Sequence, residues 1–205
     1  TYSVNGKLMN DITIPDGYSW TPIANAAAPY TGTFDGAGHT IDNLVANQPG
    51  VSYMGFVVSL KGTIKDLTLG SSCSVTGRNR TGSICGINEG TITNCHNNGN
   101  VTGAEYVGGI CGENNGIVTN CDNTGSVRGS SELVGGICGL SSNTVSNCHN
   151  DGNVTGTGEY ANYVGGVSGY NGGTITNRYN TGKARGAHES VGGVCGQNYQ
   201  CIHDC

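Results

Sequence analysis

Apolar residues return along this chain in short runs beside glycines, at a nearly constant spacing. The clearest run is Val-Gly-Gly-Ile-Cys-Gly at residues 107–112. The corresponding glycine in successive copies of this run stands at Gly55, Gly82, Gly108, Gly135, Gly165 and Gly192. The copies are therefore 26 to 30 residues apart, and a fixed period of this length indicates a stacked repeat architecture.

Each repeat divides into three short β-rich pieces separated by turns. Residues 91–93 (Thr-Ile-Thr) alternate polar and apolar side chains, and residues 101–103 (Val-Thr-Gly) form a later, shorter piece. Gly or Asn stands at each corner, and we expect both residue types there because they adopt a positive φ more readily than others. This pattern predicts an all-β fold, a right-handed parallel β-solenoid (β-helix) of about six coils with an N-terminal capping segment.

One Asn recurs directly after the β-rich run of each central repeat. If one repeat forms one coil, these residues stack at the strand spacing of a sheet, about 4.8 Å per layer. Each side-chain amide can then hydrogen-bond to the amide in the next coil, as in other Asn ladders. The predicted ladder consists of Asn94, Asn120, Asn147 and Asn177.

Residues 1–50 do not follow the repeat. They contain the single Trp, at position 20, and a predicted turn at Asp35-Gly36. A solenoid needs a non-repeating end that covers its terminal layer, so we assign 1–50 to a capping segment that leads into the first coil. Residues 51–205 form the solenoid, whose last repeat is incomplete at Cys205, and we expect the remainder of a longer surface protein beyond it.

Composition narrows the function classes. Glycine accounts for 37 of the 205 residues without a Gly-X-Y period, which excludes collagen. The net charge is −5 with only 9 basic residues and no basic stripe in the sequence, which argues against nucleic acid as a partner. The longest apolar run, residues 55–60, is too short to span a bilayer, so we expect no membrane insertion.

The recurrent Gly-Gly-[Ile/Val]-x-Gly block, followed by Gly-Thr-Ile-Thr-Asn-Cys at 90–95, resembles the GLUG repeat of bacterial surface and secreted proteins. Residues 20–23 and 32–41 resemble the segment that leads into such arrays. The resemblance implies a secreted or cell-surface protein and an adhesin-like role. It provides no catalytic residues, and the His-Glu-x-x-His motif of the metallopeptidases that carry such repeats is absent from this chain.

Eight of the ten cysteines fall into two columns. The first holds Cys85, Cys111, Cys138 and Cys195, and the second holds Cys95, Cys121, Cys148 and Cys205. One coil has Ser168 and Arg178 in place of both cysteines, which suggests that the two positions are partners within a coil. This predicts the structural disulfides Cys85–Cys95, Cys111–Cys121, Cys138–Cys148 and Cys195–Cys205. Disulfides between adjacent coils and free core thiols are the alternatives, and a zinc site is disfavoured because the sequence has no Cys-x-x-Cys pair.

The loops before each Gly-Gly block vary most between repeats and carry glutamates and tyrosines. Variable loops along one edge of a solenoid commonly bind ligands, and tyrosines suit sugar or protein contacts. The candidate ligand-binding residues are Glu105, Tyr106, Glu132, Glu159, Tyr160, Tyr163 and Glu189. Stacked glutamates would repel one another unless the loops splay or a cation such as calcium lies between them, so calcium is a possible ligand and solvated loop glutamates are the alternative.

A second polar column, made of His96, Asp122, His149 and Tyr179, is interpreted as a hydrogen-bonded surface column, without a metal or a cofactor. Paired carboxylates of the kind that cleave polysaccharides are sparse, so we expect no enzyme activity and no catalytic residues. The sequence therefore predicts a non-catalytic extracellular module that binds a host glycan or protein, acts as a rigid stalk, or does both. A pure spacer beside a catalytic domain and a polysaccharide-cleaving β-helix are the alternatives.

Overall fold

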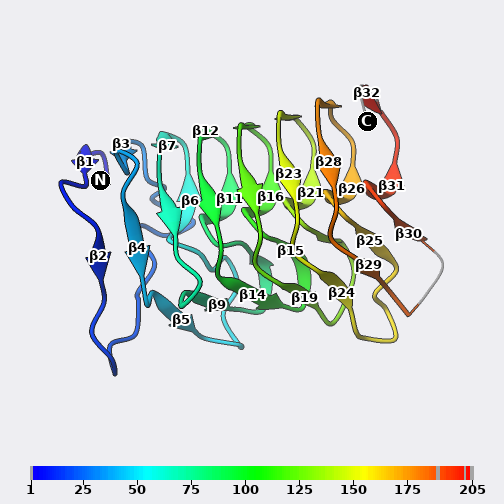
Figure 1. Cartoon of the computed structure of the whole chain (residues 1–205), viewed down its shortest axis with the longest axis horizontal. Helices are drawn as coiled ribbons and strands as arrows, with labels where there is room; N and C mark the ends of the chain where they lie inside the picture. Colours follow the sequence, from blue (N-terminus) through cyan, green and yellow to red (C-terminus); the bar gives the residue numbers. More distant parts are fainter. Residues whose placement is uncertain (1, 188–189, 201, 204–205) are drawn as a thin grey trace.

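The computed structural model describes residues 2–187, 190–200 and 202–203. In this part of the chain all regular secondary structure is β-strand, and no helix is long and apolar enough to cross a membrane. Successive turns of the chain stack side by side from the N-terminus to the C-terminus (Figure 1). The structure confirms the predicted parallel β-solenoid, with about seven turns in place of the expected six.

Each complete turn contributes one strand to each of five parallel sheets, named A to E in the order in which the chain visits them. Sheet A comprises β6 (Val57–Leu60), β11 (Cys85–Asn88), β16 (Cys111–Asn114), β21 (Cys138–Ser141), β26 (Ser168–Asn171) and β31 (Cys195–Asn198). Sheet B comprises β1 (Gly6–Lys7), β3 (Thr33–Asp35), β7 (Thr63–Lys65), β12 (Thr91–Thr93), β17 (Ile117–Thr119), β22 (Thr144–Ser146), β27 (Ile175–Thr176) and β32 (Ile202–His203). The repeat thus holds five short strands, and the expectation of three was wrong because two-residue strands at the corners leave no alternation to detect.

The remaining strands complete the cross-section of the solenoid. Sheet C comprises β2 (Ile12–Thr13), β4 (Thr40–Asp42), β8 (Thr68–Leu69), β13 (His96–Asn97), β18 (Asp122–Asn123), β23 (His149–Asn150) and β28 (Tyr179–Asn180). Sheet D comprises β5 (Val45–Asn47), β9 (Ser74–Thr76), β14 (Asn100–Gly103), β19 (Val127–Gly129), β24 (Val154–Gly156) and β29 (Ala184–Arg185). Sheet E comprises β10 (Asn79–Thr81), β15 (Glu105–Gly108), β20 (Val134–Gly135), β25 (Tyr163–Gly165) and β30 (Ser190–Gly192).

Residues 1–50 join the same sheets as the repeats. β1 pairs with β3, which pairs with β7, so the first strands lie in register with the repeat strands of sheet B. Two aromatic side chains of this region pack against Phe56 of the first coil: the rings of Trp20 and Phe56 stack at 5.2 Å, and Phe34 meets Phe56 edge-on at 4.9 Å. The indole N–H of Trp20 donates to the Phe56 carbonyl at 3.1 Å, so its polar atom is satisfied within the apolar end.

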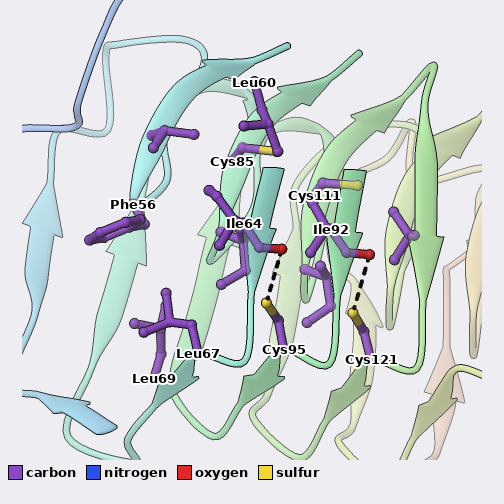
Figure 2. Packing of buried hydrophobic residues seen from close by; sticks show 14 of the residues in the cluster. Phe56, Leu60, Ile64, Leu67, Leu69, Cys85, Ile92, Cys95, Cys111 and Cys121 are labelled. Carbon is purple, nitrogen blue, oxygen red and sulfur yellow. Dashed lines mark hydrogen bonds between the residues drawn. The ribbon is translucent and has the colours of Figure 1, made fainter. Parts of the chain in front are cut away.

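The interior is divided into two apolar clusters. The larger contains stacked Ile, Leu, Val and Cys side chains from sheets A, B and C, among them Ile64, Ile92 and Cys95 (Figure 2). The smaller lies between sheets D and E and consists of valines, with Ala184 packed against them: Val101, Val107, Val127, Val134, Val154 and Val164. Identical side chains therefore stack upon each other from coil to coil, which preserves packing without new shape complementarity at each layer.

The two clusters are separated by a narrow part of the coil, which we call the waist. Here the second glycine of three Gly-Gly blocks lies against an Asn side chain, as Gly136 does: a Cβ on Gly136 would lie 2.3 Å from Asn150 Cγ and 2.1 Å from the Gly166 carbonyl oxygen. The buried asparagines form a continuous ladder, since Asn97 Nδ2 donates to Asn123 Oδ1 and Asn123 Nδ2 to Asn150 Oδ1, each at 2.7 Å. The opposite walls of the coil meet at this point.

The repeats require glycine because neighbouring atoms approach the backbone closely, and not because the backbone has a positive φ. Among the described residues, the only glycines with a positive φ are Gly17 and Gly38, both outside the repeats. The expectation that glycine supplies the positive φ at the corners of the repeats was therefore wrong, since turn glycines such as Gly90 and Gly99 do not adopt it. The asparagines do supply it: Asn94, Asn120 and Asn147 have φ of 51°, 52° and 51°.

We expect Gly136→Ala to lower the free energy of unfolding by about 2–3 kcal/mol, because the added methyl group would overlap backbone of the next coil. Gly193 is the matched control, since it occupies the equivalent position in the last coil, where a Cβ would meet nothing within 4 Å. Gly193→Ala should change stability by less than about 0.5 kcal/mol. Urea denaturation of both variants measures the difference, and equal losses would contradict the waist contact.

The ladder at the waist gives a second prediction. Asn123→Ala removes bonds to the amides above and below and to the Gly125 carbonyl, so it should cost about 2–3 kcal/mol by leaving buried polar atoms unpaired. Asn115, an exposed Asn bonded to Glu113 at 2.8 Å, is the control and should cost less than about 0.5 kcal/mol as Ala. A thermal shift of similar size in both variants would refute the buried ladder as a source of stability.

Candidate functional site

The predicted Glu–Tyr loop edge lies at the corner between sheets D and E. Glu105 begins β15, and its carboxylate accepts a hydrogen bond from Asn79 Nδ2 of the preceding coil at 3.2 Å. Tyr106 follows it with a φ of 55°. Its ring faces the Arg80 guanidinium, whose carbon is 4.8 Å from the ring centroid. Both residues are half-buried in a packed arrangement.

Arg80 is the centre of that arrangement. Its guanidinium also lies over Tyr53, at 5.3 Å, and its Nε donates to Glu113 Oε2 at 2.5 Å. Stacking an Arg between two rings beside a carboxylate combines cation–π attraction with an ion pair. Burial, together with the neighbouring Glu105, raises the pKa of Tyr106. Tyr106 therefore packs against Arg80 and Glu105. This arrangement could not be predicted from the sequence, because Tyr53 and Arg80 belong to earlier coils.

The other loop residues differ in exposure. Glu132 is half-buried, and its carbonyl accepts a hydrogen bond from the Tyr106 backbone at 3.2 Å. Glu159 and Tyr160 lie in the longest of these loops, between β24 and β25, and Tyr160 is 66 % exposed. Tyr163, at the start of β25, is half-buried. Glu189 lies outside the described residues. The structure therefore joins Glu105 and Tyr106 to a packed cluster and leaves Glu159 and Tyr160 open to solvent.

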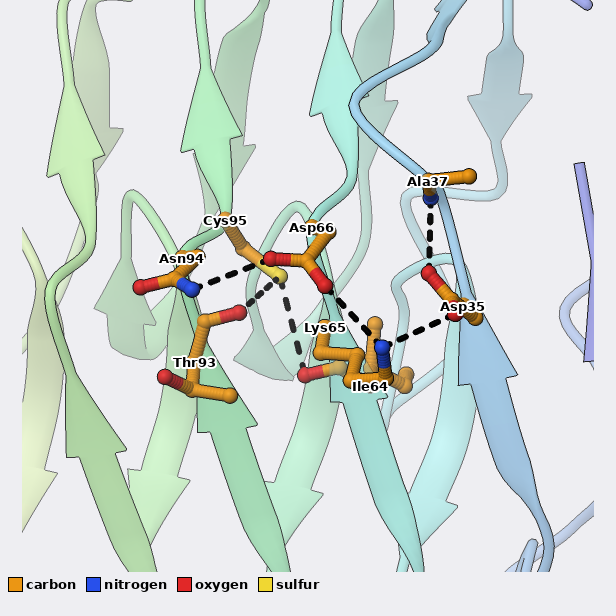
Figure 3. Close-up of polar contacts among 8 residues, drawn as sticks. All are labelled: Asp35, Ala37, Ile64, Lys65, Asp66, Thr93, Asn94 and Cys95. Carbon is orange, nitrogen blue, oxygen red and sulfur yellow. Dashed lines mark hydrogen bonds and ion pairs between the residues drawn. The ribbon is translucent and has the colours of Figure 1, made fainter.

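The predicted Asn ladder lies on the outside of the corner between sheets B and C. Asn147 Nδ2 donates to Asn120 Oδ1 at 3.1 Å, and Asn94 Nδ2 donates to Asp66 Oδ1 at 3.0 Å. Asn177 occupies the same corner with a φ of 47°. Lys65 Nζ bridges Asp66 and Asp35 at this corner, at 3.1 and 2.8 Å (Figure 3).

Sequence analysis missed the buried ladder at the waist. Its members are the first residues of Asn-x-Gly turns, in which Asn97 Oδ1, for example, accepts from the Gly99 N–H at 3.2 Å. The signal was present, because the Asn recurs at the same place in four successive repeats as Asn97, Asn123, Asn150 and Asn180. The periodicity alone did not indicate that these Asn side chains are buried.

Seven of the described cysteines are free thiols in the structure: Cys73, Cys85, Cys95, Cys111, Cys121, Cys138 and Cys148. Cys201 and Cys205 lie outside the described residues. Cysteines of one column are register neighbours: Cys85 pairs with Cys111, and Cys111 with Cys138, whose Sγ atoms are 3.4 Å apart. In the second column, Cys95 Sγ points to the carbonyl oxygens of Thr93 and Ile64, at 3.4 and 3.7 Å (Figure 3). The closest contact thus joins adjacent coils, while the within-coil disulfides stay a prediction.

The surface column on sheet C has the expected neighbours. His96 Nδ1 is paired with an Asp122 carboxylate oxygen, and the ring of His149 stacks on Tyr179 at a centroid distance of 4.7 Å. Among the described residues no group of three or more His, Cys, Asp or Glu side chains could hold a metal ion. Calcium binding at the loop glutamates was predicted as possible, and it stays a prediction.

The stack of parallel coils, each built from one copy of a sequence repeat, defines this chain as a β-solenoid repeat protein. Residues 103–128 match the family model of the GLUG motif, so the chain carries the repeat that its sequence resembles. A stretch of 93 residues, 41 % of this chain, is 41 % identical to Halomucin of Haloquadratum walsbyi. The matched stretch spans 1 % of the length of Halomucin.

The fold is similar to the crystal structure of a provisionally assigned immunoglobulin A1 protease from Bacteroides ovatus, with a TM-score of 0.73. The similarity covers 99 % of this chain and 68 % of that chain, at 22 % sequence identity. At this identity the likeness shows a common fold and no more.

Burial predicts the reactivity of the thiols. Desolvation raises the pKa of Cys121 well above its ordinary value, so the protonated, unreactive form dominates in the folded protein at neutral pH. In the reduced protein we expect Cys121 to be alkylated by iodoacetamide at least about a hundredfold more slowly than in the unfolded chain. Raising the pH from 7 to 9 should accelerate only the unfolded chain. Peptide mapping after timed labelling measures both rates, and fast labelling of the folded protein would contradict the buried column.

Proposed function

We propose that this chain is a non-catalytic, extracellular module that binds a host glycan or protein through the loops between sheets D and E. The observation that carries the proposal is the loop at 157–162, which projects from an otherwise uniform stack. It adds three residues to the 27-residue spacing of its neighbours and exposes Glu159 and Tyr160. An exposed Tyr on a rigid support provides a large contact surface at a low cost in conformational entropy.

Placement outside the cell is supported by the relatives. Residues 103–128 match the GLUG motif, and the resemblance to that repeat implies a surface or secreted protein. The similar fold from Bacteroides ovatus belongs to a protein provisionally assigned as an immunoglobulin A1 protease. A module of this kind in a comparable protein would meet host molecules at the cell surface or in secretions. The low fraction of charged residues, 11 %, and the many Asn, Thr and Ser side chains suit an uncharged binding or spacer surface.

The carboxylates support a non-catalytic role. Asp35 and Asp66 are bound by Lys65, Glu113 by Arg80, and Glu105 by Asn79. The Lys65 hydrogen bond, with a further one from the Ala37 N–H, lowers the pKa of Asp35. A glycosidase needs one carboxyl group with a raised pKa as general acid, whereas hydrogen bonds from Asn94 and Lys65 lower the pKa of Asp66 as well.

The first experiment is a glycan and host-protein array with the purified chain, with and without calcium. We expect saturable binding that Glu159→Ala with Tyr160→Ala weakens at least about tenfold. Tyr18→Ala is the matched control, because Tyr18 is 69 % exposed and lies in a different part of the chain. If removal of calcium abolished ligand binding, this would support a calcium site in the loops that carry the glutamates.

If the chain bound no ligand on the array, either with or without calcium, the binding role would be contradicted. The uniform register of the coils would then favour the spacer, since a stack bonded at every layer is a stiff rod. Cleavage of pectins or host glycans by the purified chain would refute the non-catalytic assignment.

A further inference from the structure

From its second strand onward, the outer face of sheet D is built from neutral polar and basic residues alone. In each of these strands a buried Val, or the half-buried Ala184 in the last strand, lies between two residues that face solvent, which is the alternation of a half-buried strand. The outward pairs, from the second to the last strand, are Ser74 and Thr76, Asn100 and Thr102, Ser126 and Arg128, Asn153 and Thr155, and Lys183 and Arg185. This set contains no carboxylate, although the chain has a net charge of −5.

The basic side chains that form no ion pair within the described part of the chain are concentrated on this face and at its edge. Of the nine basic residues, Arg178 is buried, and Lys61, Lys65 and Arg80 form ion pairs with Glu89, Asp35 and Asp66, and Glu113. Lys7 lies near Asp35 and helps to lower the pKa of that carboxyl group. The four others lack an ion pair among the described residues and lie on sheet D or at the corner that follows it: Arg78, Arg128, Lys183 and Arg185.

The same face offers unused hydrogen-bond donors. Asn100 Oδ1 accepts from the Ser126 N–H at 3.2 Å, and Asn153 Oδ1 accepts from the Lys183 N–H at 3.3 Å. These bonds orient both amides and leave their Nδ2 groups free as donors within the described part of the chain. The hydroxyl groups of Thr102 and Thr155 likewise have no partner within it.

Two shallow hollows open along this face. One, of about 190 Å³, is lined by Asn153, Thr155, Lys183 and Arg185. The other, of about 220 Å³, includes Thr76, Thr102 and Arg128 in its lining. The first has a mainly polar lining, whereas Pro49 and Ala104 add apolar surface to the second. Both are open, and they follow one another along the solenoid axis. Their chemistry suits a ligand that lies across several coils and presents anionic groups together with hydroxyl groups.

We propose that the outer face of sheet D binds a linear anionic polysaccharide that runs along the solenoid axis. This inference rests on the proposed binding function and assigns it a ligand class and a second surface. Arg128 and Arg185 belong to one register column two layers apart, about 9–10 Å at the spacing of strands. That separation is on the scale of two successive sugars, so alternate anionic sugars can meet successive cations.

The face favours a polysaccharide over a nucleic acid. It carries no aromatic side chain in its two outward columns, so bases have no surface on which to stack. Four cations on a chain of net charge −5 also release few counterions, which gives weak attraction to a duplex at physiological salt. Amide and hydroxyl donors beside the cations complement sugar hydroxyl groups as well as carboxylate or sulfate groups.

The test compares four probes by isothermal titration calorimetry at low salt: heparin, hyaluronan, neutral dextran and duplex DNA. The variant is Arg128→Thr with Arg185→Thr, because Thr occupies the same column in the neighbouring coils. The control is Lys7→Thr with Lys61→Thr, which removes the same charge from two exposed lysines elsewhere. Circular dichroism checks that each protein is folded, and Lys183→Asn, which copies Asn153, provides an independent single variant.

We expect heparin, hyaluronan or both to bind, and dextran not to bind. Binding by heparin alone would identify sulfate as the recognised group, and binding by hyaluronan would show that carboxylate suffices. The sheet D variant should weaken binding about tenfold or more and reduce the slope of log affinity against log salt by about two. The control variant should leave the slope nearly unchanged.

Equal losses in variant and control would overturn the inference, because they would report net charge alone. Dextran binding as tight as heparin binding, or DNA binding with the same sensitivity to Arg128 and Arg185, would also overturn it. An array ligand that depends on Glu159 and Tyr160, with no anionic polysaccharide bound, would leave the proposed function standing without this inference. If the chain bound no ligand on the array and no probe in the titrations, both the proposed function and this inference would be contradicted.

Discussion

The contact at the waist, between a glycine on one wall of the coil and an asparagine on the other, is the constraint on which the solenoid depends. Two walls that approach within van der Waals distance leave no room for a side chain on one side and no water for a polar group on the other. Glycine satisfies the first condition. The Asn ladder satisfies the second, since each buried amide is bonded along the column at 2.7 Å.

The first coils show what happens where that contact is relaxed. Leu69 occupies the ladder position in the coil before Asn97, and Phe56 occupies the second glycine position, so apolar volume replaces the amide and the gap. In the next coil Ser83 stands where the later coils have Gly, and its buried hydroxyl oxygen has no hydrogen-bond partner. The contact between a glycine and an asparagine is therefore incomplete in these two coils and complete in the coils that follow. This agrees with the sequence, in which the Gly-Gly pair first appears after residue 100.

The parts of this structure that could be predicted are those with a period. The repeat length, the parallel stacking and the positive φ at Asn94, Asn120 and Asn147 all followed from spacing and residue type. The five-strand cross-section did not, because strands of two residues carry no alternation. The Arg80 stack and the basic face of sheet D could not be predicted either, since both join residues of different coils whose relation depends on register.

The loop at 157–162 lengthens its coil, yet Val127 pairs with Val154 before it and Val134 pairs with Val164 after it. Loop length is therefore uncoupled from the alignment of the core. A chain built in this way can gain, lose or exchange a loop by a local change in the gene, without refitting any other layer. Recognition can diversify rapidly on such a scaffold while the scaffold itself stays constant.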